Sequence, residues 1–179
     1  ESTAFMVTDM LKSVMTSGTG TTANVSGLPV AGKTGTTNYT DEERQKYNIS
    51  RTPVPDAWFV GYTTNYTAAI WTGGENRKDY LDKSEQKYAQ RMFKALMTKV
   101  SEGKKTKDFK KPGSVVKVGV EKGSDPAALP SANTPSNQIV YEYFVKGTEP
   151  TKVSETFDSL EAPNVGVEYD EAAQQLKVS

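Results

Sequence analysis

The sequence of 179 residues contains no cysteine and no histidine. A Ser-His-Asp triad, a thiolate nucleophile and a zinc site built from histidine or cysteine therefore cannot form within this chain. Any general base must be a lysine, aspartate, glutamate or tyrosine. The chain also lacks net charge, because 22 basic residues balance 22 acidic ones. We therefore expect no nucleic-acid partner. We also expect no metal and no cofactor.

Long apolar runs are also missing. No stretch approaches the roughly 20 apolar residues that a membrane-spanning helix needs. The first letters, ESTAFMVTDM, contain no basic region and no apolar signal core. We expect no membrane segment in this chain, and we expect the chain to be part of a longer polypeptide.

The spacing of apolar residues predicts helices, a strand and a hairpin in the first part of the chain. Apolar residues form one helical stripe over residues 3–16 and another over 84–100. A short strand is predicted from Val30, and antiparallel strands are predicted at 58–63 and 66–72. This order predicts an α+β fold in which helices cover an antiparallel sheet. The large aromatic residues of the hairpin are expected to be core or face residues rather than ligands: Trp58, Phe59, Tyr62 and Trp71.

Two polar stretches lack this periodicity. Residues 38–55 end in two prolines and are interpreted as a long excursion without a regular element. The letters GKKTKDFKKPG, which begin at Gly103, indicate a boundary between a first domain at 1–105 and a second part at 106–179. The second part contains the strand-like letters SVVKVGV and QIVYEYFVKG, so it is predicted to be a β-leaning appendage or linker.

The stretch GLPVAGKTGTT, which begins at Gly27, matches a nucleotide-binding pattern. Gly27 and Gly32, followed by Lys33 and Thr34, fit the phosphate loop of nucleotide hydrolases. Such a loop needs a buried strand before it and a helix directly after it. The preceding letters are polar, Pro29 removes a loop amide, and the following GTTNYT opposes a helix. An ATP site is therefore disfavoured.

The same letters fit a strand at an exposed sheet edge. Lys33, Thr34 and Gly35 would offer a cation, a hydroxyl and an open backbone to another extended chain. The segments LKSVMTSGTGTTA, AGKTGTTN, DAWFVGYT and AAIWTGG follow in this order. In the letters and the order of these segments, the chain closely resembles the last third of the transpeptidase domain of class A, bifunctional penicillin-binding proteins, above all those of Gram-positive cocci. The resemblance is strong over residues 1–105, continues loosely through EYFVKGTEP, and implies the C-terminal portion of the serine β-lactamase and transpeptidase fold.

The resemblance implies roles for four residues of this strand. Lys33 is expected to be charged, to assist proton transfer beside a relay serine and to attract the substrate carboxylate. The side chains of Thr34 and Thr36 are expected to hydrogen-bond that carboxylate, and strand alternation places both on one face. The Thr36 amide is expected to complete an oxyanion hole. Gly35 is expected to let the acyl chain pair with the strand edge.

The family's nucleophile and proton-relay motifs precede this strand along the chain, whereas the matching letters here follow it. Ser-x-x-Lys patterns begin at Ser84, Ser101 and Ser114, and a Ser-x-Asn pattern begins at Ser131. We interpret all four as chance matches. The polypeptide is therefore expected to begin after the nucleophile and relay motifs, and to be inactive alone.

The resemblance also implies a function. We expect part of a D,D-transpeptidase that cross-links peptidoglycan stem peptides through an acyl-serine intermediate and is acylated by β-lactams. The expected partners are stem peptides, β-lactams and the upstream part of the same protein, which would carry a glycosyltransferase domain and a membrane anchor. The expected location is the extracytoplasmic face of the bacterial membrane. The alternatives are a D,D-carboxypeptidase or β-lactamase, and a non-catalytic wall-binding module with the same fold.

Overall fold

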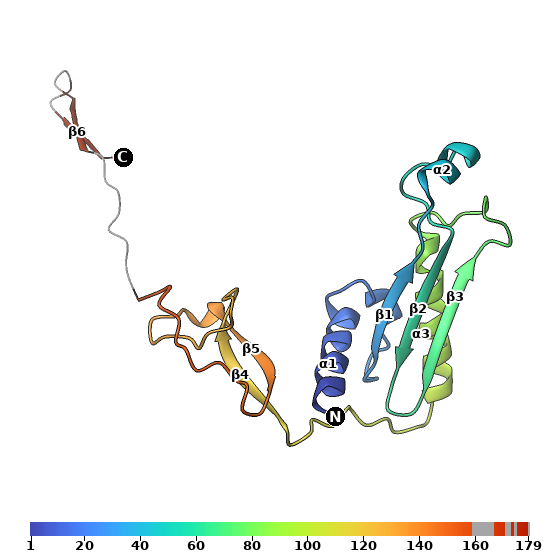
Figure 1. Cartoon of the computed structure of the whole chain (residues 1–179), viewed down its shortest axis with the longest axis horizontal. Coiled ribbons are helices and arrows are strands. Elements are labelled where there is room, and N and C mark those ends of the chain that lie inside the picture. Colours follow the sequence, from blue (N-terminus) through green and yellow to red (C-terminus); the bar gives the residue numbers. More distant parts are fainter. Residues whose placement is uncertain (159–166, 171–172, 174, 179) are drawn as a thin grey trace. The chain divides into compact units, whose positions relative to one another are not determined.

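A computed structural model describes residues 1–158, 167–170, 173 and 175–178. The chain forms two compact units, Glu1–Val115 and Val116–Ser179 (Figure 1). No helix within the described residues is long and apolar enough to cross a membrane.

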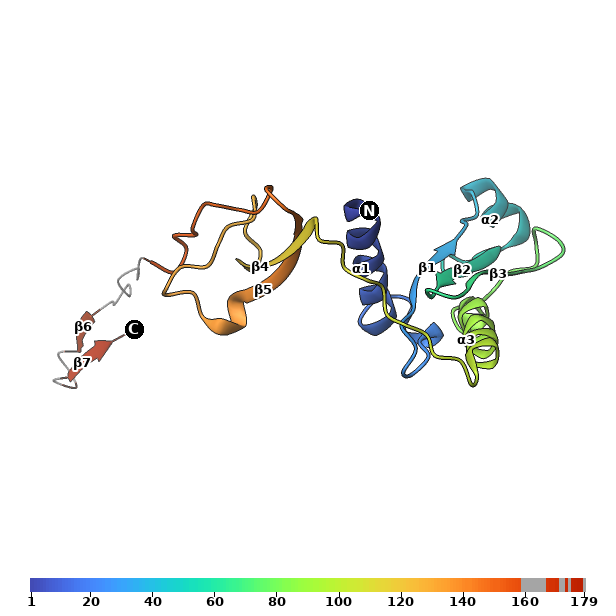
Figure 2. The same cartoon turned by 90° about the horizontal axis from the view of Figure 1, so that it is seen from below.

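An antiparallel sheet with helices beside it forms the first unit. Its main elements are α1 (Ser2–Thr16), β1 (Ala31–Thr36), α2 (Asp41–Tyr47), β2 (Asp56–Tyr62), β3 (Thr67–Gly73) and α3 (Tyr88–Ser101). The strand order is β1-β2-β3, so β1 and β3 are the edges of this sheet. Helix α3 crosses one face of the sheet, and α1 lies alongside β1 (Figures 1 and 2). This architecture confirms the predicted α+β fold.

Two phenylalanines join the sheet to α3. Phe59 on β2 and Phe93 on α3 are fully buried, and their ring centroids lie 4.7 Å apart in an edge-to-face arrangement. Met15 of α1 and Met97 of α3 extend this core. Gly61 on β2 permits the close approach, because a Cβ there would lie 2.6 Å from the Phe93 ring. The tight packing fixes β2, and through it β1, against α3.

The two predicted helices and the hairpin are confirmed, with small shifts at their ends. A short 3-10 helix, Glu85–Lys87, precedes α3 where the sequence predicts α-helix. The hairpin strands pair so that Tyr62 lies opposite Thr67. In the turn between them, the Thr63 hydroxyl accepts hydrogen bonds from the backbone amides of Asn65 and Tyr66. A side-chain acceptor in the turn thus replaces the missing strand partners.

The connection between β1 and β2 contains α2, so the prediction that residues 38–55 lack a regular element is wrong. A capping box starts this helix: the Thr40 hydroxyl accepts from the Glu43 amide at 3.2 Å, and the Glu43 carboxylate accepts from the Thr40 amide at 2.9 Å. Asn48 ends it in the left-handed conformation, with φ of 54°. The helix buries no residue, so its signal is the capping chemistry rather than an apolar stripe.

The lysine-rich segment after α3 contacts the first unit, although residues 104–112 form no helix or strand. Lys12 of α1 donates to both carboxylate oxygens of Asp108 at 2.7 Å, and this ion pair lowers the pKa of Asp108. Phe109 packs edge-to-face on Tyr62, with ring centroids 5.5 Å apart. The first compact unit therefore continues to Val115. The division of the chain into domains after residue 105 stays a prediction.

Strands dominate the second unit, as the sequence predicts for the appendage. Strand β4 (Val115–Glu121), which begins at the unit boundary, pairs with β5 (Ile139–Val145), and β6 (Val167–Asp170) forms an antiparallel hairpin with β7 (Gln175–Val178). The side chain of Glu121 is buried and accepts hydrogen bonds from Ser154 at 2.7 Å and Thr134 at 3.1 Å. The Ser154 hydrogen bond is the largest of the contacts that lower the pKa of Glu121.

Candidate functional site

The four predicted site residues lie together on β1 at an edge of the sheet. On its paired side, Lys33 lies opposite Val60 and Gly35 lies opposite Trp58. An added Cβ at Gly35 would meet only the Trp58 Cβ, at 3.5 Å, which is ordinary van der Waals contact. Packing within the chain therefore does not require glycine here. At Gly32, by contrast, a Cβ would lie 2.6 Å from the Phe59 ring, so the fold itself excludes a side chain.

Strand alternation divides the four residues between the two faces of the sheet. Lys33 and Gly35 share a face with Trp58, whereas Thr34 lies opposite Phe59, on the face that α3 covers. The Lys33 ammonium group folds over the strand, because its Nζ donates to the Thr34 carbonyl oxygen at 2.9 Å and lies 3.4 Å from Thr34 Oγ1. A cation and a hydroxyl thus meet at the free edge of β1, where they can bind an anion together.

Thr34 has a second partner that the sequence does not reveal. Its Oγ1 lies 2.8 Å from the Oγ1 of Thr19, in the connection between α1 and β1. The Thr19 carbonyl oxygen accepts a hydrogen bond from the side-chain amide of Gln90 on α3, at 3.1 Å. The glycine-rich letters around Thr19 predict a turn, but nothing in them identifies a partner on α3.

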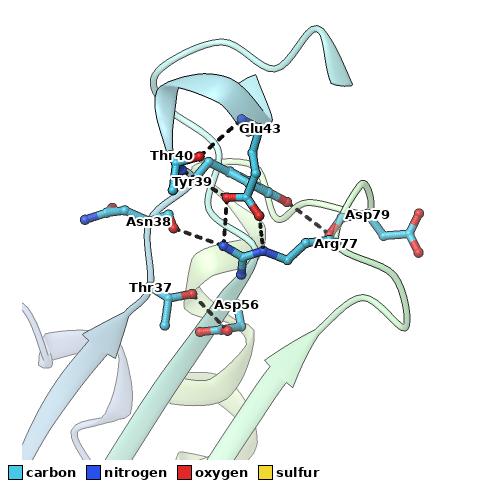
Figure 3. A network of polar contacts seen from close by, with 8 residues as sticks. All are labelled: Thr37, Asn38, Tyr39, Thr40, Glu43, Asp56, Arg77 and Asp79. Atoms are coloured by element: carbon cyan, nitrogen blue, oxygen red, sulfur yellow. Dashed lines mark hydrogen bonds and ion pairs between the residues drawn. The ribbon is translucent and has the colours of Figure 1, made fainter. Parts of the chain in front are cut away.

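Thr36 is the last residue of β1 and is exposed. The next residue, Thr37, donates from its hydroxyl to the Asp56 carboxylate at 2.9 Å (Figure 3). Because Asp56 begins β2, this hydrogen bond closes the base of the connection that contains α2. The backbone at Thr36 is therefore held between the β1-β2 ladder and this closure.

An ion pair fixes the far part of the same connection, which we call the rim (residues 37–55). Arg77, from the connection between β3 and α3, donates to both carboxylate oxygens of Glu43 at 2.7 and 3.0 Å and to the Asn38 carbonyl at 3.2 Å (Figure 3). Its guanidinium lies 5.2 Å from the centroid of the Tyr39 ring, which is 5% exposed. The Tyr39 hydroxyl donates to the Asp79 carbonyl at 3.4 Å. These contacts join two connections at one end of the sheet.

The ion pair makes the stability of the rim depend on pH. The hydrogen bonds from the Arg77 guanidinium and the Thr40 amide lower the pKa of Glu43 from its ordinary 4.5 to about 2. The lowered pKa means that the folded state favours the charged form of Glu43. The stabilisation of the folded state is therefore complete above pH 4.5 and is lost as the pH falls through 2.

We expect Glu43→Gln to lower the thermal midpoint of the protein, and we expect the difference from wild type to vanish near pH 2. Above pH 5 the difference should be constant, because Glu43 is then charged in both the folded and the unfolded chain. Glu75→Gln, at an exposed residue of the connection that contains Arg77, is the matched control. A difference of the same size at pH 2 and pH 7 would contradict the role of the carboxylate charge.

The aromatic residues of the hairpin divide into two kinds. Phe59 is fully buried, as expected of a core residue. Trp58 and Trp71 pair directly across β2 and β3 but are 42% and 48% exposed. Val60, on the same face, is 43% exposed. The sheet face that carries Lys33 thus holds an exposed apolar surface made by Trp58, Val60 and Trp71.

The structure excludes the phosphate-loop interpretation. Gly32, Lys33 and Thr34 lie inside strand β1, and the chain continues as strand to Thr36. No helix begins at Lys33, so its neighbours present no helix N-terminus to a phosphate. Within the described part of the chain, no group of three or more His, Cys, Asp or Glu residues could hold a metal ion.

Comparison with known families identifies both parts of the chain. The family model of the penicillin-binding protein transpeptidase domain matches residues 1–98, and that of the penicillin-binding protein 1A C-terminal domain matches residues 111–159. Penicillin-binding protein 1A/1B of Bacillus subtilis is 50% identical over 99% of this chain and 20% of its own length. Penicillin-binding protein 1A of Streptococcus pneumoniae is 42% identical over 66% of this chain and 17% of its own length.

A solved structure supports the same assignment at the level of the fold. The crystal structure of penicillin-binding protein 1A from Haemophilus influenzae matches 85% of this chain and 21% of its own, with a TM-score of 0.60 and 22% identity. The chain thus spans about a fifth of the length of the relatives it matches. Because the transpeptidase model covers more than half of the chain, the chain belongs to the penicillin-binding protein transpeptidase domain family.

Proposed function

We propose that this chain is part of a peptidoglycan D,D-transpeptidase that forms an acyl-serine intermediate and is acylated by β-lactams. The observation that carries the proposal is that β1, in a member of the transpeptidase family, carries Lys33, Thr34, Gly35 and Thr36 and lies at the edge of its sheet, with no strand paired to its outer side among the described residues. An extended stem peptide can pair with such an edge through its backbone. Packing leaves Gly35 open, and this supports close approach by the substrate.

The strand residues have distinct roles in this proposal. Lys33 would attract the terminal carboxylate of a stem peptide or a penicillin and assist proton transfer to the relay serine. The hydroxyls of Thr34 and Thr36 would donate hydrogen bonds to the same carboxylate. The amide of Thr36, together with the amide of the nucleophilic serine, would bind the oxyanion of the tetrahedral intermediate. The closure from Thr37 to Asp56 supports this role, because it limits movement of the strand end.

The serine nucleophile and the relay motif are proposed to lie upstream in the same protein. The exposed apolar surface on the Lys33 face supports this arrangement, because soluble proteins rarely leave such a surface uncovered. An upstream part packed on Trp58, Val60 and Trp71 would bring its own residues to the side of the sheet that carries Lys33. Without that part, this chain lacks the nucleophile and is expected to be inactive.

The proposed substrate determines on which side of the membrane the protein would act. Peptidoglycan stem peptides lie outside the cytoplasmic membrane, so the protein would act at the extracytoplasmic face, held there by a segment upstream of this chain. A glycosyltransferase domain upstream is part of the proposal as well, because the sequence resembles class A, bifunctional penicillin-binding proteins. Residues 111–159, which match the model of the penicillin-binding protein 1A C-terminal domain, would belong to the same extracytoplasmic portion.

Two other functions remain compatible with the strand residues alone. A D,D-carboxypeptidase or β-lactamase would pass the same acyl group to water, and a non-catalytic wall-binding module would keep the fold without the nucleophile. We expect the intact protein, given glycan strands with pentapeptide stems, to release D-alanine and form cross-linked dimers in equal amounts. Penicillin should stop both. Release of D-alanine without dimers would favour hydrolysis, and neither product would favour a binding module.

A further inference from the structure

We infer that Thr19 is a positioning residue of this site, which directs the hydroxyl proton of Thr34 toward the substrate carboxylate. The inference rests on the proposed function, because it assigns a role to a neighbour of the substrate-binding strand. Thr19 lies outside that strand, in the turn after α1, and contacts it through one hydrogen bond of 2.8 Å between the two hydroxyl oxygens.

The hydrogen-bond capacity of Thr34 gives Thr19 this role. A threonine hydroxyl has one proton to donate and two lone pairs that accept. Among the described residues, Thr34 Oγ1 has two partners, the Lys33 ammonium at 3.4 Å and the Thr19 hydroxyl at 2.8 Å. The ammonium can only donate. If Thr19 also donates, both lone pairs of Thr34 are used and its proton is left for a third group.

A bound substrate carboxylate favours the arrangement in which Thr19 donates to Thr34 and Thr34 donates to the carboxylate. Hydrogen bonds to a charged acceptor are roughly twice as strong as those between neutral groups, so Thr34 donates to the carboxylate when it arrives. Thr19 must then be the donor of the hydroxyl pair. Without the Thr19 hydroxyl, the Thr34 oxygen keeps only the longer contact to Lys33, and its proton is free to turn away from the substrate.

The backbone of Thr19 is held firmly enough to serve this purpose. Its carbonyl accepts from the side chain of Gln90, which is 6% exposed on the buried face of α3. The Gln90 Oε1 atom is buried without a partner in the described part of the chain, a destabilising arrangement that an apolar side chain would avoid. Gly20, the next residue, packs against Met15, where a Cβ would lie 3.2 Å from the sulfur. The turn is thus fixed between α1 and α3.

The test compares variants of the intact protein for their second-order rate of acylation by a penicillin. We expect Thr19→Val, which keeps the shape of the side chain and removes its hydroxyl, to lower this rate about tenfold. Thr19→Ser keeps the hydroxyl, so its acylation rate should lie within about twofold of the wild-type rate. Thr21→Val is the matched control, because Thr21 lies in the same connection and its hydroxyl has no partner among the described residues. Thermal midpoints of all variants should agree closely.

A double-mutant cycle separates positioning from a general structural effect. If Thr19 acts through Thr34, the loss caused by Thr19→Val should disappear in a Thr34→Val background. Gln90→Leu, which removes the support of the Thr19 carbonyl and fills the core, should lower the rate about threefold. A Thr19→Val effect of undiminished size in the Thr34→Val background, or no effect at all, would overturn the inference. A wild-type protein that no penicillin acylates would instead overturn the proposed function on which it rests.

Discussion

Replacement of Lys33 by alanine is expected to lower the rate of acylation of the intact protein by a penicillin about 100- to 1000-fold. The loss combines the attraction of the ammonium group for the carboxylate with its part in proton transfer, and each is large in a site that excludes water. Lys33 is exposed, and among the described residues its side chain donates hydrogen bonds to Thr34 alone, so the fold should survive the change.

Two variants control the Lys33 experiment. Lys33→Arg keeps the charge and should retain more activity than Lys33→Ala, although its planar group cannot replace a compact ammonium fully. Lys46→Ala, on the exposed side of α2, should have no effect on acylation. If Lys33→Ala were acylated at the wild-type rate while its thermal midpoint was unchanged, Lys33 would be an ordinary surface residue and the proposed site would be wrong.

Replacement of Gly35 by alanine is expected to leave the protein folded and to reduce acylation about 100-fold. The nearest atom to an added Cβ is 3.5 Å away, so the methyl group fits the free protein. It would project from β1 beside the edge where the acyl chain has to pair, and a displacement of about 1 Å at a reacting centre costs rate on this scale.

Gly61→Ala is the matched comparison for Gly35→Ala. Its Cβ would lie 2.6 Å from the Phe93 ring and 2.9 Å from the Phe59 ring, so we expect it to destabilise the folded state by about 1–3 kcal/mol. Thermal unfolding should thus separate the two glycines: Gly61→Ala loses stability, whereas Gly35→Ala loses acylation. A Gly35→Ala protein that unfolds early, or one that reacts normally, would contradict the assignment of this edge to substrate.

The sequence carried enough information for the main elements of the first unit. The apolar stripes of α1 and α3 and the aromatic hairpin are local patterns. Each predicted the ends of its element to within a few residues. The strand with Lys33 was predictable because its glycines and threonines oppose the helix that the competing phosphate loop requires. These predictions depend on neighbours close in sequence, where spacing alone determines which side chains share a face.

The contacts that complete the site are long-range, and no local pattern contains them. Arg77 and Glu43 come from different connections, so their pairing depends on how those connections meet at one end of the sheet. Thr19 lies in the turn after α1 and Gln90 lies on α3, so their pairing depends on how α3 packs beside that turn. The short helix α2 was missed because its signal is a capping box and it has no buried face.

The hairpin shows a different limit of sequence reasoning. Its strand β2 carries large apolar side chains on both faces, Trp58 on one and Phe59 on the other, so alternation gives no polar marker for the solvent side. The structure shows that Phe59 is in the core and Trp58 is half exposed. The sequence predicts only a structural role for Trp58. Its exposure in the folded chain supports an upstream partner that packs on the Lys33 face.

The central claim is that this chain supplies the wall of a penicillin-reactive site whose nucleophile lies elsewhere in the same protein. Peptide mass spectrometry of the intact protein after exposure to a penicillin tests the claim most directly. We predict one covalent adduct, on a serine upstream of this chain, with residues 1–179 unmodified. An adduct on any serine within residues 1–179 would contradict the account, because the nucleophile would then belong to the chain that we describe as its support.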